Sequence, residues 1–242
     1  KKLKNVLITG ASGGLGKLTT KYFADNGWNV IATMISLDLA EDLEGYPNVK
    51  CYQMDITTTE NIELAKKQIL ADFSTIDVII NNAGLANRAE ALDHNDDLWD
   101  QTIEIDLTAP FILSREIGKG MAQRGYGKII FIASMWTFLG GKNVISYTAA
   151  KTALAGLTRG LSNELLPMGI TVNAIAPGFI ETDITQAIRK DSERTTWITS
   201  RIPKGRWGQP SDLAGAALFL SAPASDYVSG VVLAVDGGFL AN

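Results

Sequence analysis

The chain is poor in the side chains that build disulfide bonds and metal sites, since its 242 residues include one cysteine and one histidine. Because Cys51 has no second cysteine to pair with, an internal disulfide bond and a cysteine-rich metal site are excluded, and we expect a buried, inert thiol. His94 stands in the polar run DHNDDLWD, which is typical of a solvated loop. We therefore expect neither a metal ion nor a histidine-based catalytic triad.

An excess of charge of one sign is also lacking. Lysine and arginine total 22 against 26 acidic residues, a formal net charge of −4, and the basic residues are scattered. Nucleic acids and anionic membranes bind clustered basic side chains, so we expect small molecules and further copies of the chain as partners. No apolar run approaches the length of a membrane span, and the first residues, KKLKNVLITG, lead into a strand pattern rather than a signal peptide. These features predict a cytoplasmic protein.

Short apolar runs alternate with helical patterns along the whole chain. Runs suited to buried parallel strands occur at residues 6–9, 30–34, 49–54, 76–80, 128–133, 170–174 and 231–235. Helices are expected at 14–26, 97–124, 147–166 and 210–220, and another after a capping box of Thr57 and Glu60. The alternation predicts an α/β, doubly wound Rossmann fold in which a seven-stranded parallel sheet carries helices on both faces. Residues 1–242 are expected to form a single domain.

Residues 181–206 break this rhythm. The segment is polar and rich in arginine and threonine. Such an excursion from a compact body is typical of a lid over a substrate site, and an ordinary surface helix and loop would give the same pattern.

Glycines cluster where the first strand turns into the first helix. Gly10, Gly14 and Gly16 follow the form G-x-x-x-G-x-G. In a doubly wound sheet this turn is where a dinucleotide pyrophosphate meets backbone N–H groups and the positive end of a helix. The end of the second strand, VIATMISLDLAED, offers neither a clear acid nor a base at the positions that contact the adenosine ribose. The lack of a cation there slightly favours NAD over NADP.

Three polar residues suggest proton-transfer chemistry beside this turn. Tyr147 and Lys151 are four residues apart in SYTAAK and share one helix face, and Ser134 ends the strand GKIIFIAS at its carboxyl end. A tyrosine has an ordinary pKa of about 10, and a neighbouring ammonium together with an oxidised nicotinamide would lower it. Tyr147 would then act as the general acid/base while Ser134 hydrogen-bonds the substrate oxygen.

These patterns together resemble the classical short-chain dehydrogenase/reductase family. The family motifs T-G-x-x-x-G-x-G, N-N-A-G, Ser with Y-x-x-x-K, and P-G-x-x-x-T occur in order over essentially the whole chain. The resemblance implies an NAD(P)-dependent oxidoreductase with Ser134, Tyr147 and Lys151 as catalytic residues. It implies coenzyme contacts from Gly10, Ser12, Gly14, Leu15, Gly16, Asp55, Ile56, Asn82, Ala83, Gly84, Tyr147, Lys151, Pro177, Gly178, Ile180 and Thr182. It also implies a homotetramer with helices 97–124 and 147–166 as candidate interfaces.

One position departs from the family pattern. The family has an asparagine in the motif N-L-x-x-x-F, and IDLTAPF places Asp106 there. If that residue acts through its backbone carbonyl, holding a water in a proton relay with the lysine, aspartate can replace it. If the side-chain amide is required, turnover falls or the pH profile shifts. We expect Asp106 to belong to the catalytic group and activity to be retained.

The segments NNAGLANRAEAL, RIPKGRWGQPSDLAG and AVDGGFLAN look like those of the family branch acting on gluconate and 2-dehydro-3-deoxygluconate. The resemblance implies oxidation or reduction of a secondary alcohol or ketone of a sugar acid. Arginine matches the geometry of a carboxylate, so Arg88 is a candidate substrate residue, and Trp136 is a candidate to pack on a sugar face. Three further candidates lie in the proposed lid: Arg194, Arg201 and Arg206. A reductase of 3-oxoacyl thioesters or other small ketones, and a dinucleotide-binding sensor without turnover, remain as alternatives.

Overall fold

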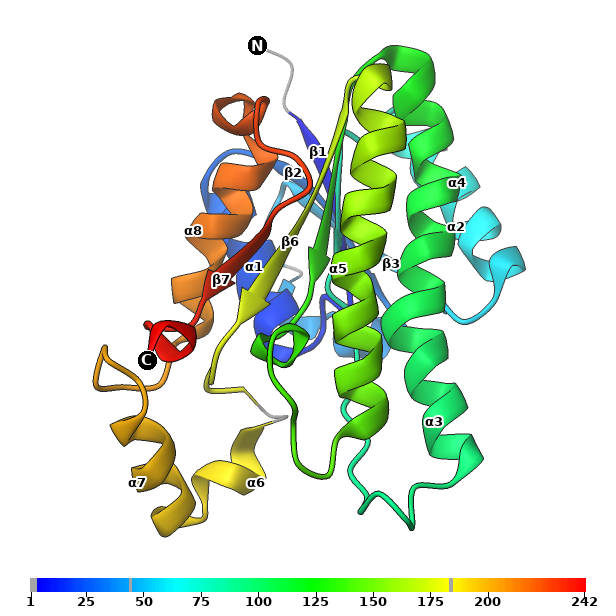
Figure 1. The fold of residues 1–242 in the computed structure, drawn as a ribbon. Helices are drawn as coiled ribbons and strands as arrows, with labels where there is room; N and C mark the ends of the chain where they lie inside the picture. Colours follow the sequence, from blue (N-terminus) through cyan, green and yellow to red (C-terminus); the bar gives the residue numbers. More distant parts are fainter. Residues whose placement is uncertain (1–3, 44, 183–184) are drawn as a thin grey trace.

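A computed structural model describes residues 4–43, 45–182 and 185–242. At its centre lies a seven-stranded parallel sheet in the order β3-β2-β1-β4-β5-β6-β7 (Figure 1). The strands are β1 (Asn5–Thr9), β2 (Asn29–Met34), β3 (Val49–Gln53), β4 (Val78–Asn81), β5 (Gly127–Ile132), β6 (Ile170–Pro177) and β7 (Val232–Val235). The predicted doubly wound fold is therefore confirmed.

Helices cover both faces of the sheet (Figure 1). On one face, α1 (Gly14–Asp25) and α8 (Pro210–Ser221) pack against the strands through Phe23 and Leu213. On the other face, α2 (Thr59–Phe73), α4 (Ala109–Arg124) and α5 (Ile145–Leu165) contribute Ile62, Leu113 and Leu154. Because both faces are covered, the central strands are buried over almost their whole length, which is why their sequences read as continuous apolar runs.

Chain order reverses between β1 and β4, the two neighbours at the middle of the sheet. From β1 the chain runs outward through β2 to β3, and it then crosses back to β4 and continues to β7 on the other side. The loops that leave the carboxyl ends of β1 and β4 consequently separate, one toward each face. A ligand cleft is expected at this point in a doubly wound sheet.

Three local expectations were wrong. The cap of α2 is Thr58, whose Oγ1 accepts a hydrogen bond from the backbone N–H of Asn61, because the Thr57 hydroxyl bonds to Asp55 instead. The single helix expected at 97–124 is α3 (Asp96–Ile103) and α4 joined by a π-helix, η3 (Glu104–Thr108). Cys51 is only half-buried, because β3 is the edge strand of the sheet.

The described residues of the 181–206 segment, 181–182 and 185–206, form helices outside the sheet. The segment contains α6 (Gln186–Arg189) and α7 (Ser192–Ser200), which lie beyond the carboxyl edge of the sheet (Figure 1). Its apolar residues Ile188 and Ile198 join a separate cluster built on Phe179, Trp207 and Phe239. The segment is therefore attached by an aromatic cluster of its own rather than by the core of the sheet.

Membrane-spanning helices and clusters of metal-binding side chains are both absent from the residues that the structure describes. None of their helices is long and apolar enough to cross a membrane. Nowhere in the described part of the chain do three histidine, cysteine, aspartate or glutamate side chains gather as a metal ion would need.

Candidate active site

A cleft of about 540 Å³ opens at the carboxyl ends of β1, β4, β5 and β6. Each of the sixteen residues expected to contact a coenzyme lines it, from Gly10 in the first turn to Thr182 after β6. Ser134 and Asp106 line the same cleft. Arg88 and Trp136, the two expected substrate residues, are not among its lining residues.

The glycine turn is shaped for a close approach of its backbone to other groups. Gly10 has a φ of +63°, which a residue with a side chain rarely adopts. A Cβ at Gly16 would overlap the Gly10 carbonyl oxygen and lie 2.6 Å from Nδ2 of Asn82. Gly13 precedes the first turn of α1, where backbone N–H groups lack partners within the helix. This combination provides the N–H groups and the space that a pyrophosphate needs.

Asn82 and Thr9 fasten the turn to the neighbouring strand. Nδ2 of Asn82 donates to the backbone oxygens of Thr9, at 2.9 Å, and Gly10, at 3.3 Å. In return, the Thr9 hydroxyl accepts hydrogen bonds from the backbone N–H groups of Asn82 and Ala83, both at 3.0 Å. The coenzyme turn and the N-N-A-G segment therefore form one rigid unit at the switch point of the sheet.

The expected catalytic residues meet at the inner end of the cleft. Ser134 follows β5 and is 7% exposed, and Tyr147 and Lys151 lie on one face of α5. The Ser134 hydroxyl lies close enough to the Tyr147 phenol to lower its pKa, and the Lys151 ammonium lies 5.4 Å from the centre of the Tyr147 ring. The same ammonium donates to the Ile132 carbonyl at 3.0 Å.

Asp106 occupies the position beside Lys151. Its carboxylate Oδ1 lies 2.9 Å from Nζ of Lys151, and both side chains are almost fully buried. Burial raises the pKa of Asp106 against the lowering effect of Lys151. For Lys151, burial lowers the pKa, but the charges of Asp106 and Tyr147 outweigh it and the net shift is upward.

The tyrosine differs from its expected state. Burial raises the pKa of Tyr147, and the Asp106 charge adds to this, while Lys151 opposes both. Lys151 lowers the pKa as expected, but burial, the largest effect, outweighs it. The second expected contribution, the positive charge of an oxidised nicotinamide, would come only with the bound coenzyme. Without a further positive charge in the cleft, the resting form of Tyr147 is the neutral phenol.

Comparison with known proteins decides the family. Residues 10–240 match a family model described as enoyl-(acyl carrier protein) reductase. A 2-dehydro-3-deoxy-D-gluconate 5-dehydrogenase of Pseudoalteromonas atlantica is 47% identical over 98% of this chain and 96% of its own. The chain belongs to the short-chain dehydrogenase/reductase family.

Other members of the family are similar over the same length. A 5-keto-D-gluconate 5-reductase of Escherichia coli is 38% identical over 98% of this chain and 95% of its own. The crystal structure of a gluconate 5-dehydrogenase from Burkholderia cenocepacia, in complex with NADP and tartrate, has a TM-score of 0.94 and 32% identity, covering 99% of this chain and 96% of that one. This short-chain dehydrogenase/reductase is accordingly an NAD(P)-dependent oxidoreductase acting on CH–OH groups.

The four candidate arginines differ in their contacts. Arg88, in the loop after β4, lies close enough to Arg194 of α7 and to Tyr147 for their charges to shift its pKa. Arg206 instead forms a paired hydrogen bond with the carboxylate of Asp212, at 2.7 and 3.0 Å. Arg201 lies over the ring of Phe239. Arg206 and Arg201 are therefore engaged away from Tyr147, and Arg88 and Arg194 remain.

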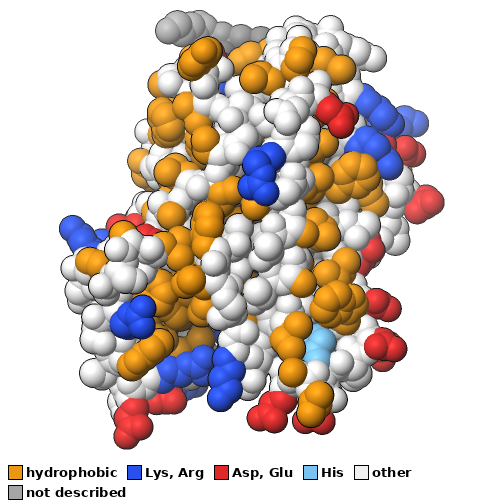
Figure 2. Space-filling view, viewed as in Figure 1, with side chains coloured by type: hydrophobic (Ala, Val, Ile, Leu, Met, Phe, Trp, Pro, Cys, Tyr) orange, Lys and Arg blue, Asp and Glu red, His pale blue; other side chains and the backbone are white. Residues whose placement is uncertain are grey.

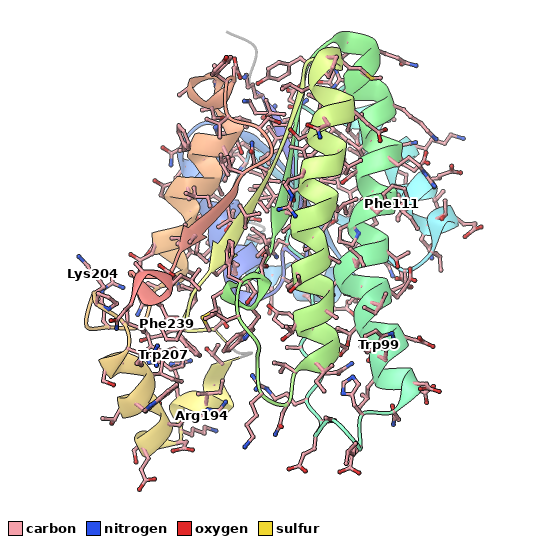
Figure 3. The ribbon with its side chains drawn as sticks, in the orientation of Figure 1. Trp99, Phe111, Arg194, Lys204, Trp207 and Phe239 are labelled. Atoms are coloured by element: carbon pink, nitrogen blue, oxygen red, sulfur yellow. The ribbon has the colours of Figure 1, made fainter. Side chains whose placement is uncertain are left out.

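Trp136 has a packing role. Its ring meets that of Phe179 edge-on, with ring centres 6.2 Å apart, beside the apolar cluster under α7. Core packing was the other role open to this residue, and the cleft does not include its side chain. Figure 3 shows the neighbouring Trp207 and Phe239 between β7 and α7, so the aromatic cluster forms the floor of the 181–206 segment.

The far end of the cleft shows why the residues after β2 are a weak indicator of the coenzyme type. Met34 and Ile35 line the cleft where β2 ends, and the first acidic residue after them, Asp38, has its carboxylate 3.1 Å from the Ser36 hydroxyl. No charged side chain among the described lining residues stands at this end beyond Asp55. The residues present therefore fit a nicotinamide dinucleotide but do not by themselves select its 2′ group.

Several lining residues escaped sequence reasoning. They are Met54, Thr57, Leu85, Ile105, Ile132, Ala133 and Thr185. Ile105 lies in the π-helix and Thr185 beyond the P-G-x-x-x-T motif, so no motif marks them. The structure shows what Thr185 does there: its hydroxyl closes the loop by donating to the Ile180 carbonyl at 2.7 Å.

Proposed function

We propose that this enzyme interconverts a secondary hydroxyl and the ketone of a sugar acid, such as gluconate or 2-dehydro-3-deoxygluconate. The observation that carries the proposal is Arg88, which lies near Tyr147, together with Arg194 close to it. Arg88 and Arg194 have like charges close together, and no acidic side chain among the described residues forms an ion pair with either. Two guanidinium groups without a counter-ion are suited to an anionic substrate.

The surface supports an anion at this place. In Figure 2, lysine and arginine side chains gather at the lower edge of the molecule, between the α6–α7 segment and the lower end of α5. Figure 3 shows Arg194 on this segment. Arg88 comes from the loop after β4, so a carboxylate between the two would join the segment to the body. We propose on this basis that residues 181–206 act as the substrate lid; Asp183 and Ile184 lie outside the described residues.

The catalytic residues would have different roles in proton transfer. In the oxidising direction, the Ser134 hydroxyl holds the substrate oxygen and Tyr147, as phenolate, accepts the hydroxyl proton. The nicotinamide coenzyme, when bound, supplies the hydride acceptor, or the hydride donor for the reverse direction. Lys151 keeps a positive charge beside the phenol and favours its deprotonated form. In the reducing direction, Tyr147 returns the proton to the alkoxide oxygen.

For the coenzyme we propose NADP. Met34 and Ile35 place no carboxylate at the end of β2 to repel a 2′-phosphate, and the Burkholderia cenocepacia gluconate 5-dehydrogenase structure contains NADP. The sequence slightly favours NAD for lack of a cation. A comparison of kcat/KM for NADP and NAD tests both predictions, and a ratio below one would leave NAD as the coenzyme.

The substrate proposal is tested by comparing gluconate with glucitol, a polyol of the same length without a carboxylate. Arg88→Gln should raise KM for gluconate at least about tenfold, because one charge-assisted contact is lost, and should leave KM for glucitol unchanged. Any change in kcat that follows from the loss of the Arg88 charge near Tyr147 should be the same for both compounds. Arg206→Gln is the matched control, because Arg206 pairs with Asp212. Equal effects of Arg88→Gln on both compounds would contradict the assignment.

Two alternative functions can be tested alongside the sugar-acid proposal: a reductase of 3-oxoacyl thioesters and a dinucleotide sensor without turnover. A 3-oxoacyl-[acyl-carrier-protein] reductase of Vibrio cholerae is 36% identical over 97% of this chain, so acetoacetyl-coenzyme A belongs in the substrate panel, and its preference over sugar acids would favour that reading. Tyr147→Phe should abolish turnover while coenzyme binding persists. Function in the cell that is unchanged by Tyr147→Phe would favour a dinucleotide sensor.

We also propose a homotetrameric, cytoplasmic enzyme. Trp99 on α3 and Phe111 on α4 point outward from the helical face (Figure 3) and are 40% and 39% exposed. Ile145, at the start of α5, is 37% exposed. Large apolar side chains on one helical face are typical of a subunit interface. Sedimentation of the wild-type chain and of Phe111→Glu measures the assembly.

A further inference from the structure

We propose that Asp106 is a positioning residue of the catalytic centre, whose carboxylate holds Lys151 in the charged form and in the orientation that serves both Tyr147 and the coenzyme. The inference rests on the proposed function for its catalytic readout. It stands on the geometry of the cleft, where Oδ1 of Asp106 is 2.9 Å from Nζ of Lys151.

The π-helix is the local reason that Asp106 reaches Lys151. An α-helical register through Glu104–Thr108 would place successive side chains differently, whereas the wider π turn inserts one residue and changes the direction of those that follow. Asp106 lies within this turn and is 0% exposed. Such turns interrupt helices at a cost and are frequent at functional sites. The contact between Asp106 and Lys151 would explain why the helix is interrupted by a π turn at this place.

The surroundings of the carboxylate leave it little freedom. Its other oxygen, Oδ2, accepts a hydrogen bond from the backbone N–H of Leu85 at 3.4 Å. A Cβ at Gly84 would lie 2.5 Å from Oδ1 and 3.4 Å from Nζ of Lys151. Glycine at position 84 therefore makes room for the ion pair, and the N-N-A-G segment fixes it from one side while α5 fixes it from the other.

The contacts of the Lys151 ammonium show which part of it remains open to a ligand. An ammonium has three N–H donors. One of them is donated to the Ile132 carbonyl at 3.0 Å. Asp106 Oδ1 lies 2.9 Å from the ammonium nitrogen as its ion-pair partner, without a hydrogen bond of normal geometry. Because Lys151 also lines the cleft, its ammonium remains available to a ligand there while the carboxylate acts on it directly by its charge.

The charged and titratable groups around Asp106 determine in which direction the pH dependence should shift when its charge is removed. Tyr147 and Lys151 face Asp106, Arg88 acts on Tyr147, and Arg194 acts on Arg88. Removing the Asp106 charge leaves burial free to lower the pKa of Lys151. It also removes a negative charge that raises the pKa of Tyr147. Both changes move the working range of the enzyme toward lower pH.

The experiment compares Asp106→Asn with Asp226→Asn. Asp226 forms an ion pair with Lys128, which is 1% exposed, at 2.7 Å, and Lys128 lies at the amino end of β5, away from the cleft. In Asp106→Asn, the pH at which affinity for reduced coenzyme is lost should fall by about one unit, and both limbs of the oxidation profile should move the same way. Asp226→Asn should match the wild type.

Coenzyme binding keeps the inference separate from the proposed function. A wild-type enzyme that oxidises no sugar acid would refute the function, and the pH dependence of coenzyme affinity would still test Asp106. Profiles of Asp106→Asn that coincide with those of Asp226→Asn would overturn the inference, whatever the change in rate. If Asp106→Asn fails to fold, Gly84→Ala displaces the same carboxylate and should shift the affinity profile in the same direction, and an unshifted profile would overturn the inference equally.

Discussion

Replacement of Gly16 by alanine tests the glycine turn most directly. The added Cβ would overlap the Gly10 carbonyl oxygen, which belongs to the backbone and cannot swing aside, and would lie 2.6 Å from Nδ2 of Asn82. That distance is ~0.8 Å short of the 3.4 Å at which ordinary contact begins. Asn82 must therefore move, and its hydrogen bonds to Thr9 and Gly10 are strained or lost.

The cost follows from these contacts. Overpacking of this kind destabilises a protein by about 1–3 kcal/mol, and each strained hydrogen bond contributes about 1 kcal/mol. If about 2 kcal/mol of this falls on the form that binds coenzyme, affinity decreases ~30-fold. Because Gly16 faces the cleft as well as the turn, the effect on coenzyme binding should exceed the effect on turnover at saturating coenzyme.

Two measurements check this expectation: the Kd for reduced coenzyme from its fluorescence, and the free energy of unfolding in urea. Gly215→Ala is the control, because Gly215 lies exposed on α8 and a Cβ there meets nothing within 4 Å. The control should bind coenzyme normally and gain up to ~1 kcal/mol of stability from helix propensity. If Gly16→Ala bound coenzyme as tightly as Gly215→Ala does, the close approach assigned to this turn would be wrong.

Two further predictions concern titrating groups. Lys119 and then Arg115 and Lys66 hold the pKa of Glu116 at about 2, below its ordinary 4.5, so the ion pairs contribute stability above pH 4.5 that is lost as the pH falls toward 2. Glu116→Gln should therefore destabilise the protein by about 1–2 kcal/mol at neutral pH and have little effect near pH 2. Urea unfolding at both pH values measures this. An equal loss of stability at the two pH values would show that packing, not charge, is responsible. Burial raises the pKa of Tyr147. The rate of oxidation, which needs the phenolate, should therefore increase as pH rises from about 7 to about 10, and the rate of reduction, which needs the phenol, should decrease over the same range. Initial rates of the two reactions that change in the same direction would contradict the role of Tyr147.

The sequence by itself determined the sheet and most of the cleft. Strands such as Val78–Asn81 and Gly127–Ile132 are buried on both faces, so they had to be apolar throughout and were legible in the sequence. The glycine turn was legible for a related reason, because close backbone approach requires glycine at positions such as 16. Motif spacing then placed Ser134, Tyr147 and Lys151 at one edge.

Tertiary structure alone decided the electrostatics and the choice among arginines. Asp106 and Lys151 are 45 positions apart, and only the π-helix and the packing of α5 bring their charges within 2.9 Å. Arg88, Arg194 and Arg206 are chemically identical in the sequence, and their roles separated only when Asp212 was found beside one and Tyr147 beside another. Local periodicity carries information about burial, whereas a pKa depends on the distances between charges that folding brings together.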